Sequence, residues 1–376
     1  MIKLLLTITS VLVIYFIQKN LYDKYWKEGL SAFINFDVPT CVEGDTITLT
    51  QVVSNNKALP IPTLEVKFQT STSLKFGDID CLNESDSEYV NNVYSMLFFQ
   101  KITRQIKVTC KRRGFYSIDN LDLSSSDLLM TTIKSIRTKS DASVLVYPAP
   151  INIDDILIPY NMVIGNILSK RYSLSDPFEF RGIRDYDVSD TMKSINWKLS
   201  AKTGSLKVNL HDYTNNQKIH ILLNLESESI WEYELLKEES IKIACSLSNM
   251  FIAEGIQTAL TSNGCDSATN KYIAVPYGSG QAHIDSIATE LAKCDYKCKM
   301  PDFADILNNL AVDEDHETPY YILISSNKSQ RIQNAFARII NDNDYLYIIP
   351  YHPEVNDINT PISLSNTLDW SVPYEC

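Results

Sequence analysis

Several patterns that would assign a class are missing from this sequence. Its 34 Lys and Arg are outnumbered by 46 Asp and Glu, and the net charge of −12 disfavours nucleic-acid binding, which needs clustered cations against phosphates. No G-x-G-x-x-G follows the first apolar strand of the C-terminal part, so a dinucleotide site is unsupported. The tetrad Ala201-Lys202-Thr203-Gly204 lacks the upstream glycine of a phosphate-binding loop.

Cysteines are also too scattered to form a small disulfide scaffold, although the chain has eight of them. Cys294 and Cys298 stand four positions apart in a stretch that reads as a helix. Two thiolates at that spacing can share a metal, but no second pair of Cys or His follows nearby. We therefore predict ordinary cysteines in a reducing compartment and no cofactor.

The first residues form the longest apolar run. Residues 2–17 read IKLLLTITSVLVIYFI, with Lys3 as the one charged side chain. A helix of that length spans about 24 Å, slightly less than a hydrocarbon core of ~30 Å, and flanking lysines can snorkel. A cleaved signal peptide is the alternative, but the following QKNLYDKYW offers no small-residue cleavage site. We expect an uncleaved membrane anchor over residues 1–20.

The residues after this run predict its surroundings. Tyr22, Tyr25 and Trp26 are the side chains expected at a membrane interface. Lysines are more frequent after the run than before it, and the positive-inside tendency then places the soluble part in the cytoplasm. The sequence predicts a single-pass protein of the cell membrane.

Two soluble domains are expected, because 376 residues are too many for one ordinary core and 44% of them are hydrophobic. Residues 36–150 predict an antiparallel β-sandwich-like module. Its short β-rich runs lie at 45–53, 63–70, 93–99, 104–110 and 143–148. Nothing in this module has the spacing of a catalytic site.

Residues 151–211 contain a segment that is basic within an acidic chain. Between residues 170 and 210, Lys and Arg number eight and Asp and Glu five, interleaved around Phe178, Phe180, Tyr186 and Trp197. Interleaved charges of this kind predict a paired network that aromatic side chains partly shield. The network can serve as a clasp between domains, as a docking surface for a partner, or as a set of catalytic acids and bases. No nucleophile stands out in it.

The same segment resembles the signature of DUF family 58, a family of unknown function. The matching positions are Glu179-Phe180, Arg184, Tyr186, Asp190, Ile195-Asn196-Trp197 and Ser200-Ala201-Lys202, while Ser189 replaces the usual Gly. The resemblance extends over nearly the whole chain. It implies a partner-docking set, Glu179, Phe180, Arg184, Tyr186, Asp190, Asn196, Trp197, Lys198 and Lys202, and a MoxR-type AAA+ ATPase as the partner.

Residues 212–376 alternate strand and helix patterns, which predicts an α/β module with a mostly parallel sheet. Expected strands lie at 218–225, 257–262, 320–326 and 345–351, and expected helices at 231–254, 282–297 and 331–342. In the family this module resembles a von Willebrand factor A-like (Rossmann-like) domain. Its D-x-S-x-S cation motif is degenerate here, with Asn224, Glu226 and Glu228 at the three ligand positions.

The combined prediction is an α+β multidomain chain with an N-terminal membrane helix, acting as an adaptor for a protein partner and not as an enzyme. We expect no metal at the degenerate site. Two alternatives stay open. One is a carboxylate-dependent hydrolase that uses Glu179 and Asp190. The other is a divalent-cation-dependent binding module that uses Glu226 and Glu228.

Overall fold

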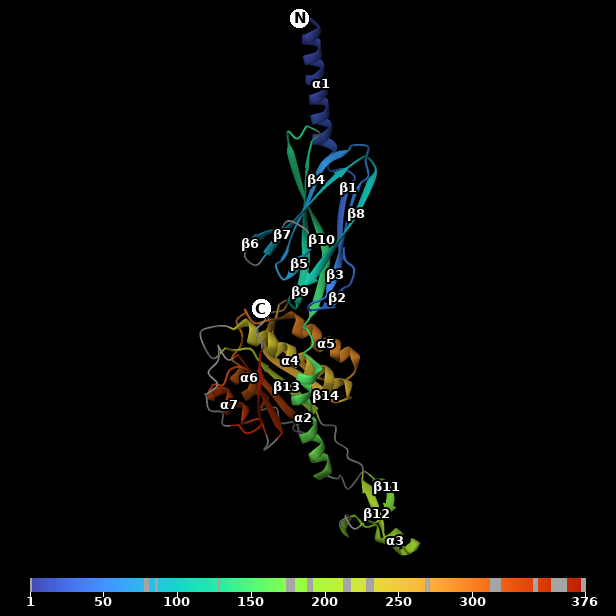
Figure 1. The fold of residues 1–376 in the computed structure, drawn as a ribbon, viewed down its shortest axis with the longest axis vertical. Helices are drawn as coiled ribbons and strands as arrows, with labels where there is room; N and C mark the ends of the chain where they lie inside the picture. The colour runs from blue at the N-terminus through green and yellow to red at the C-terminus, as the bar shows by residue number, and fades with distance from the viewer. Residues whose placement is uncertain are drawn as a thin grey trace. The chain divides into compact units, whose positions relative to one another are not determined.

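A computed structural model gives the fold, and it divides the chain into two units (Figure 1). Unit 1 comprises residues 1–149 and 291–293, and unit 2 comprises residues 150–290 and 294–376. The structure describes residues 2–77, 81–84, 87–127, 129–173, 180–187, 192–211, 218–227, 233–267, 269, 271–311, 319–340, 344–352 and 364–372.

Unit 1 begins with helix α1 (Ile2–Tyr25), whose last turn packs against the strands that follow. Tyr22 and Trp26 are buried, and the Tyr22 hydroxyl donates to the Pro60 carbonyl at 2.8 Å. Burial raises the pKa of Tyr22 to about 12. Lys134 Nζ lies 2.5 Å from Asp23 Oδ1. The end of α1 is therefore part of a protein core.

The predicted membrane anchor is wrong. Among the described residues, no helix combines the length and the apolar character that a membrane crossing requires. The predicted interface aromatics Tyr22 and Trp26 face protein, and Tyr25 alone of the three is partly exposed. The assignments to a transmembrane helix and to a single-pass protein of the cell membrane are withdrawn with it.

The rest of unit 1 is two sheets that bury two hydrophobic clusters. The four-stranded sheet has the order β1 (Leu30–Phe36), β3 (Thr46–Asn55), β8 (Gln100–Cys110), β5 (Leu74–Phe76). The six-stranded sheet has the order β2 (Thr40–Val42), β10 (Ile133–Tyr147), β9 (Gly114–Ser126), β4 (Ile61–Ser71), β7 (Ser87–Met96), β6 (Cys81–Glu84). β2 pairs parallel to β10, and the remaining pairs are antiparallel.

The core of unit 1 follows from strand alternation. In β3, every second side chain is buried, including Leu49 and Val53. Leu49 packs in one cluster with Phe68 of β4 and Val144 of β10 from the opposite sheet, and Val53 packs in a second cluster with Leu64 of β4. One buried contact between the sheets is polar, because Gln51 Oε1 accepts from Asn92 Nδ2 at 2.9 Å and from the Tyr94 hydroxyl at 2.8 Å.

Unit 2 is built on a seven-stranded mixed sheet. Its order is β15 (Tyr272–Gly278), β14 (Gln257–Asp266), β13 (Lys218–Asn224), β17 (Tyr320–Ser325), β18 (Tyr345–Tyr351), β19 (Thr367–Ser371), with β16 (Cys294–Asp295) paired to β14. The pairs from β14 to β19 are parallel, and β15 and β16 pair antiparallel to β14.

Five helices of unit 2 accompany this sheet: α2 (Ile153–Ser173), α4 (Glu234–Ala253), α5 (Gln281–Lys293), α6 (Phe303–Leu310) and α7 (Gln330–Phe336). Phe303 of α6 and Phe336 of α7 pack with Leu222 and Leu323 of the sheet. Tyr160 of α2 stacks on Phe251 of α4 with ring centroids 5.4 Å apart. The central strands are consequently buried along their whole length.

The predicted fold class is wrong as stated. The described residues hold nineteen strands against seven α-helices, so the chain is β-rich. Two of the four sheets among the described residues mix parallel and antiparallel pairs. In the six-stranded sheet, β2 is the parallel strand, and in the seven-stranded sheet, β15 pairs antiparallel at the edge. The von Willebrand factor A-like description of residues 212–376 is withdrawn.

The predicted shared helix for Cys294 and Cys298 is also wrong. α5 ends at Lys293, and Cys294 lies in β16. Cys298 pairs with Cys265 of β14 in a disulfide, whereas Cys294 is buried and takes no part in that disulfide. The expectation of ordinary thiols therefore fails for Cys265 and Cys298.

Candidate functional site: a hairpin–helix unit around Trp197

The signature segment folds into a small hairpin–helix unit, defined as β11 (Phe180–Asp185), the 3-10 turn η1 (Met192–Ser194), α3 (Trp197–Thr203) and β12 (Lys207–His211) (Figure 1). β11 and β12 pair antiparallel, with Asp185 opposite Lys207 and Ile183 opposite Asn209. A bridge from Ile195 to Val208 attaches the connecting segment to the hairpin, and both side chains are buried.

Helix α3 has only seven residues, which is too short for stability from its own hydrogen bonds. Asn196 caps its first turn, because its Oδ1 accepts from the Leu199 amide at 3.0 Å. Gly204 ends the helix in the left-handed conformation, φ 71°, and its N–H donates to the Ser200 carbonyl at 2.9 Å. Both ends of the helix are therefore fixed by side-chain and backbone bonds.

Two polar side chains attach α3 to the hairpin. Asn196 Nδ2 donates to Asn209 Oδ1 at 2.8 Å. Ser200 Oγ donates to the Asn196 carbonyl and accepts from the Lys207 amide, each at 2.8 Å. Ser200 is buried, so its hydroxyl holds the helix against β12 instead of standing open as a nucleophile.

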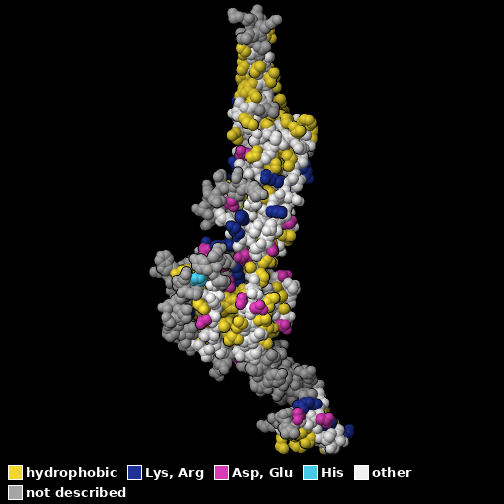
Figure 2. Space-filling view, in the orientation of Figure 1, with side chains coloured by type: hydrophobic (Ala, Val, Ile, Leu, Met, Phe, Trp, Pro, Cys, Tyr) yellow, Lys and Arg dark blue, Asp and Glu magenta, His cyan; other side chains and the backbone are white. Residues whose placement is uncertain are grey.

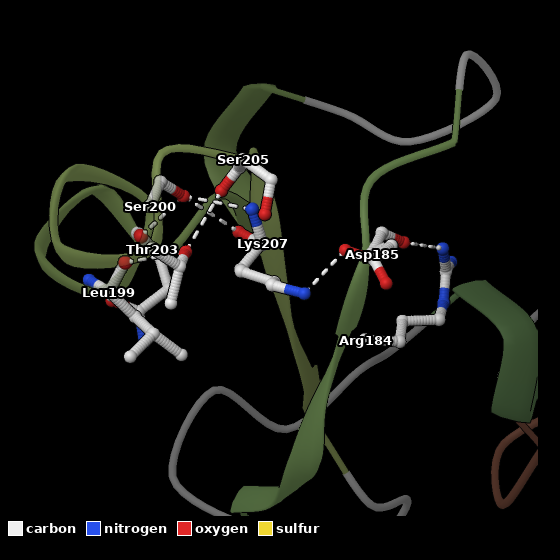
Figure 3. Close-up of polar contacts among 8 residues, drawn as sticks. Arg184, Asp185, Leu199, Ser200, Thr203, Ser205 and Lys207 are labelled. Carbon is white, nitrogen blue, oxygen red and sulfur yellow. Dashed lines mark hydrogen bonds and ion pairs between the residues drawn. The ribbon is translucent and has the colours of Figure 1, made fainter.

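The charged side chains of this unit include one close ion pair, shown in Figure 3. Lys207 Nζ lies 2.5 Å from Asp185 Oδ1 across the hairpin. Arg184 donates to the backbone carbonyl of Asp185 at 3.1 Å. Since both Asp185 and Arg184 are exposed, these contacts favour the observed register of the hairpin but contribute little to its free energy of folding.

The predicted docking residues have different outcomes. Glu179 and Asp190 lie outside the described residues. Whether basic side chains neutralise these two carboxylates is therefore not described. Phe180 belongs to β11 by its backbone, and the Tyr186 amide donates to the Leu206 carbonyl at 3.0 Å, which continues the hairpin. Lys198 and Lys202 are exposed on one side of α3, four positions apart.

Trp197 is the residue whose environment departs most from expectation. Its side chain is 61% exposed on the first turn of α3, instead of shielding the charged network. The described side chains buried in the unit are those of Ile195, Ser200 and Val208, and the tryptophan is left on its surface. Met192, Leu206 and Ile183 are exposed in the same unit. Figure 2 shows hydrophobic side chains gathered on its lower rim.

Three positions that hold this site together were given no structural role from the sequence. Ser200 matched the family pattern without a stated role, and Lys207 and Asn209 were not singled out. The alternation of Lys207, Val208 and Asn209 around a buried valine is the pattern that marks them as one strand face.

The degenerate cation motif lies at the carboxyl end of β13. Asn224 is buried, and its Nδ2 donates to Ser325 Oγ at 3.0 Å, while its Oδ1 accepts from Asn263 Nδ2 and from the Glu226 amide, each at 3.0 Å. Asn224 thus connects β13, β14 and β17 through protein contacts.

Glu226 also has a protein partner. Its Oε1 accepts from the Phe303 amide at 3.0 Å, at the start of α6. Burial raises the pKa of Glu226, and this hydrogen bond opposes the effect. Glu228 lies outside the described residues. Within the part of the chain that the structure describes, no three His, Cys, Asp or Glu side chains are grouped to hold a metal ion.

His220 of β13 is a buried titratable group that the sequence did not reveal. Its Nε2 lies 2.8 Å from Thr261 Oγ1, its Nδ1 lies 3.2 Å from the Tyr277 hydroxyl, and its ring stacks on Tyr321. Burial lowers the pKa of His220 to about 4, so the imidazole is neutral at pH 7.

Comparison with known proteins assigns no family. No family matches the chain in a scan of known protein families, and a search of curated proteins returns no match. Among solved structures, the chain is similar to a non-cellulosomal cohesin from Archaeoglobus fulgidus, with a TM-score of 0.23, 11% identity, and coverage of 31% of this chain and 91% of that chain.

Two further solved structures have the same low level of similarity. One is the sixth cohesin of scaffoldin B from Acetivibrio cellulolyticus, solved with a dockerin, with a TM-score of 0.23, 12% identity, and coverage of 31% and 99%. The other is a CARDB domain from Pyrococcus furiosus, with a TM-score of 0.21, 12% identity, and coverage of 32% and 94%. At TM-scores this low, none of the three assigns a function to this chain.

Proposed function

We propose that this protein is a non-enzymatic adaptor whose hairpin–helix unit docks a protein partner through Trp197. The supporting observation is the 61% exposure of Trp197 on a helix that both of its caps hold in place. Tryptophan is enriched among the few side chains that carry most of the energy of protein interfaces, and it contributes most when its position is fixed beforehand.

Charge defines the partner surface that this unit suits. Lys198 and Lys202 are exposed beside Trp197, while Asp185, an acid of the same unit, is already paired with Lys207. An acidic surface with an apolar pocket complements this arrangement, and the charges would also raise the association rate. By its resemblance to DUF family 58, the partner we propose is a MoxR-type AAA+ ATPase.

No observation on the described residues favours the two alternatives. The hydrolase depends on Glu179 and Asp190, which are not placed. The cation-dependent module depends on Glu226 and Glu228; Glu226 Oε1 already accepts from the Phe303 amide, and Glu228 is not placed. The adaptor is the function to test first.

The test measures binding of the full chain to the MoxR-type ATPase of the same organism by biolayer interferometry. We expect Trp197→Ala to raise the dissociation constant at least thirtyfold, which is the effect of removing an interface hot spot. Lys198→Glu combined with Lys202→Glu should slow association and reduce its dependence on salt.

Phe98→Ala is the matched control, because Phe98 is also 61% exposed but lies in unit 1. It should bind like the native chain. Absence of ATPase binding by the native chain would refute this partner. Equal binding by the native chain and Trp197→Ala would refute the docking surface.

A further inference from the structure

The outer face of the six-stranded sheet contains a groove that the proposed adaptor role does not use. Its volume is about 470 Å³, within the size range of small-molecule sites. Its lining comes from four strands, β4, β7, β9 and β10 of unit 1: Gln69, Thr70, Ser71, Tyr89, Phe115, Tyr116, Ser117, Asp119, Asn120, Asp122 and Arg137.

The groove forms because two neighbouring strands diverge. β4 and β9 pair from Thr63 with Ser126 as far as Lys67 with Asp122. Beyond that point, β4 continues along β7 to Ser71, and β9 continues along β10 to Gly114. Paired strands stand about 4.8 Å apart, so the end of their pairing opens the sheet surface there.

A β-bulge in β10 accompanies two adjacent polar side chains of β9 at this opening. Ile118 and Leu121 of β9 are both buried, although three positions separate them, and the residues between them, Asp119 and Asn120, are both exposed. The register against β10 shifts at the same place, between Lys139 and Ala142. Bulges often re-aim side chains beside binding sites.

The lining combines aromatic rings with hydrogen-bonding groups. Phe115 is 50% exposed at the groove, and Tyr89 lines it from β7. Arg137 binds Asp122 through two bonds, Nε to Oδ1 at 2.7 Å and Nη2 to Oδ2 at 3.0 Å. That bidentate pair leaves the groove with one carboxylate, Asp119, that makes no ion pair with any described residue.

We infer that this groove binds a neutral saccharide. The C–H face of a pyranose packs on an aromatic ring, here Phe115 or Tyr89. The carboxylate of Asp119 accepts hydrogen bonds from sugar hydroxyls, and the amides of Gln69 and Asn120 both accept and donate them. An anionic ligand would meet Asp119 and Asp122, and a cationic ligand would meet Arg137 and a single free carboxylate.

Isothermal titration of the full chain with cellobiose, maltose, lactose and diacetylchitobiose tests this inference. At least one of the four should bind, and raising the salt concentration should leave its affinity within twofold, because no charged group of the ligand takes part. Phe115→Ala should weaken that binding at least tenfold. Ser117→Trp should abolish it by filling the groove without removing a lining ring.

Phe33→Ala is the control, because Phe33 is 60% exposed on β1 of the other sheet. It should bind the sugar as the native chain does. Lysinamide serves as the cationic probe. The inference is overturned if none of the four sugars binds, if Phe115→Ala binds as well as the control, or if lysinamide binds more tightly than every sugar in a salt-sensitive way.

Discussion

At the scale of single residues, buried polar side chains of unit 2 serve as internal connections. Asn224 joins three strands, and His220 joins β13 to Thr261 of β14 and to Tyr277 of β15. Each of these groups finds partners inside the protein, which is the condition under which burial of a polar atom is tolerated. For His220, that condition holds only while the imidazole is neutral.

We therefore predict an acid-sensitive contribution from His220. The unfolded chain takes up this proton near pH 6.5, whereas the folded chain takes it up only near pH 4, because burial lowers the pKa. The contribution is complete above pH 6.5 and is lost as the pH falls toward 4, by up to about 3 kcal/mol. Urea unfolding at pH 7.0, 5.5 and 4.5 measures it.

His220→Gln provides the comparison. The glutamine cannot take up a proton, so the variant should lose less stability than the native chain between pH 7.0 and 4.5. Identical pH dependence in both proteins would contradict the prediction.

At the scale of elements, α3 depends on contacts beyond its own seven residues. Asn196 both caps the first turn and bonds to Asn209 of β12. Its removal leaves the Leu199 amide without its capping acceptor and detaches the helix from the hairpin. The effect should be concentrated in the hairpin–helix unit.

Asn196→Ala should reduce the stability of that unit by about 1–2 kcal/mol, the usual cost of losing an N-cap. Amide hydrogen exchange of residues 197–203 measures it, with faster exchange expected in the variant. Lys198→Ala is the control, because Lys198 is exposed and makes no capping bond. Equal exchange in the two variants would show that the cap does not hold α3.

The elements of unit 2 were easier to predict than their limits. Residues 345–351 form β18 as expected, because a short apolar run rich in aromatic and β-branched side chains is typical of a buried strand. The strand expected to end at Asn263-Gly264 continues to Asp266 as β14. There, Asn263 accepts from the Leu225 amide, and Gly264 allows close approach of Cys294 and Leu225.

The site was only partly predictable, for physical reasons. The family resemblance marked Asn196 and Trp197 but not their environment, since exposure depends on which face of a short helix meets the hairpin. The groove in unit 1 left no sequence signal, because it arises from where two strands stop pairing. The membrane prediction failed because no described helix is both long and apolar enough to cross a membrane, and the burial of Tyr22 and Trp26 against protein left no sequence signal.

At the scale of the whole molecule, the two units have separate cores. Leu49 and Val144 belong to the core of unit 1, and Leu222 and Leu323 to that of unit 2. Each core is made of side chains from its own unit. Chains with separate cores often depart from two-state unfolding.

We predict two resolved transitions in differential scanning calorimetry of the full chain. Leu49→Ala should lower the midpoint of one transition and Leu222→Ala that of the other, with about 2–5 kcal/mol lost in each case. The two variants serve as controls for each other. A single transition that both variants lower equally would contradict the prediction.

The buried contact of Gln51 with Asn92 and Tyr94 determines how the two sheets of unit 1 can close on each other. Aliphatic side chains would tolerate a shift of one sheet over the other, because their attraction has no direction. A shift of two residues along β3 would place the Gln51 amide against hydrocarbon. It would also leave Asn92 Nδ2 and the Tyr94 hydroxyl without this acceptor. This one amide therefore selects a single alignment from several that the apolar side chains alone would accept.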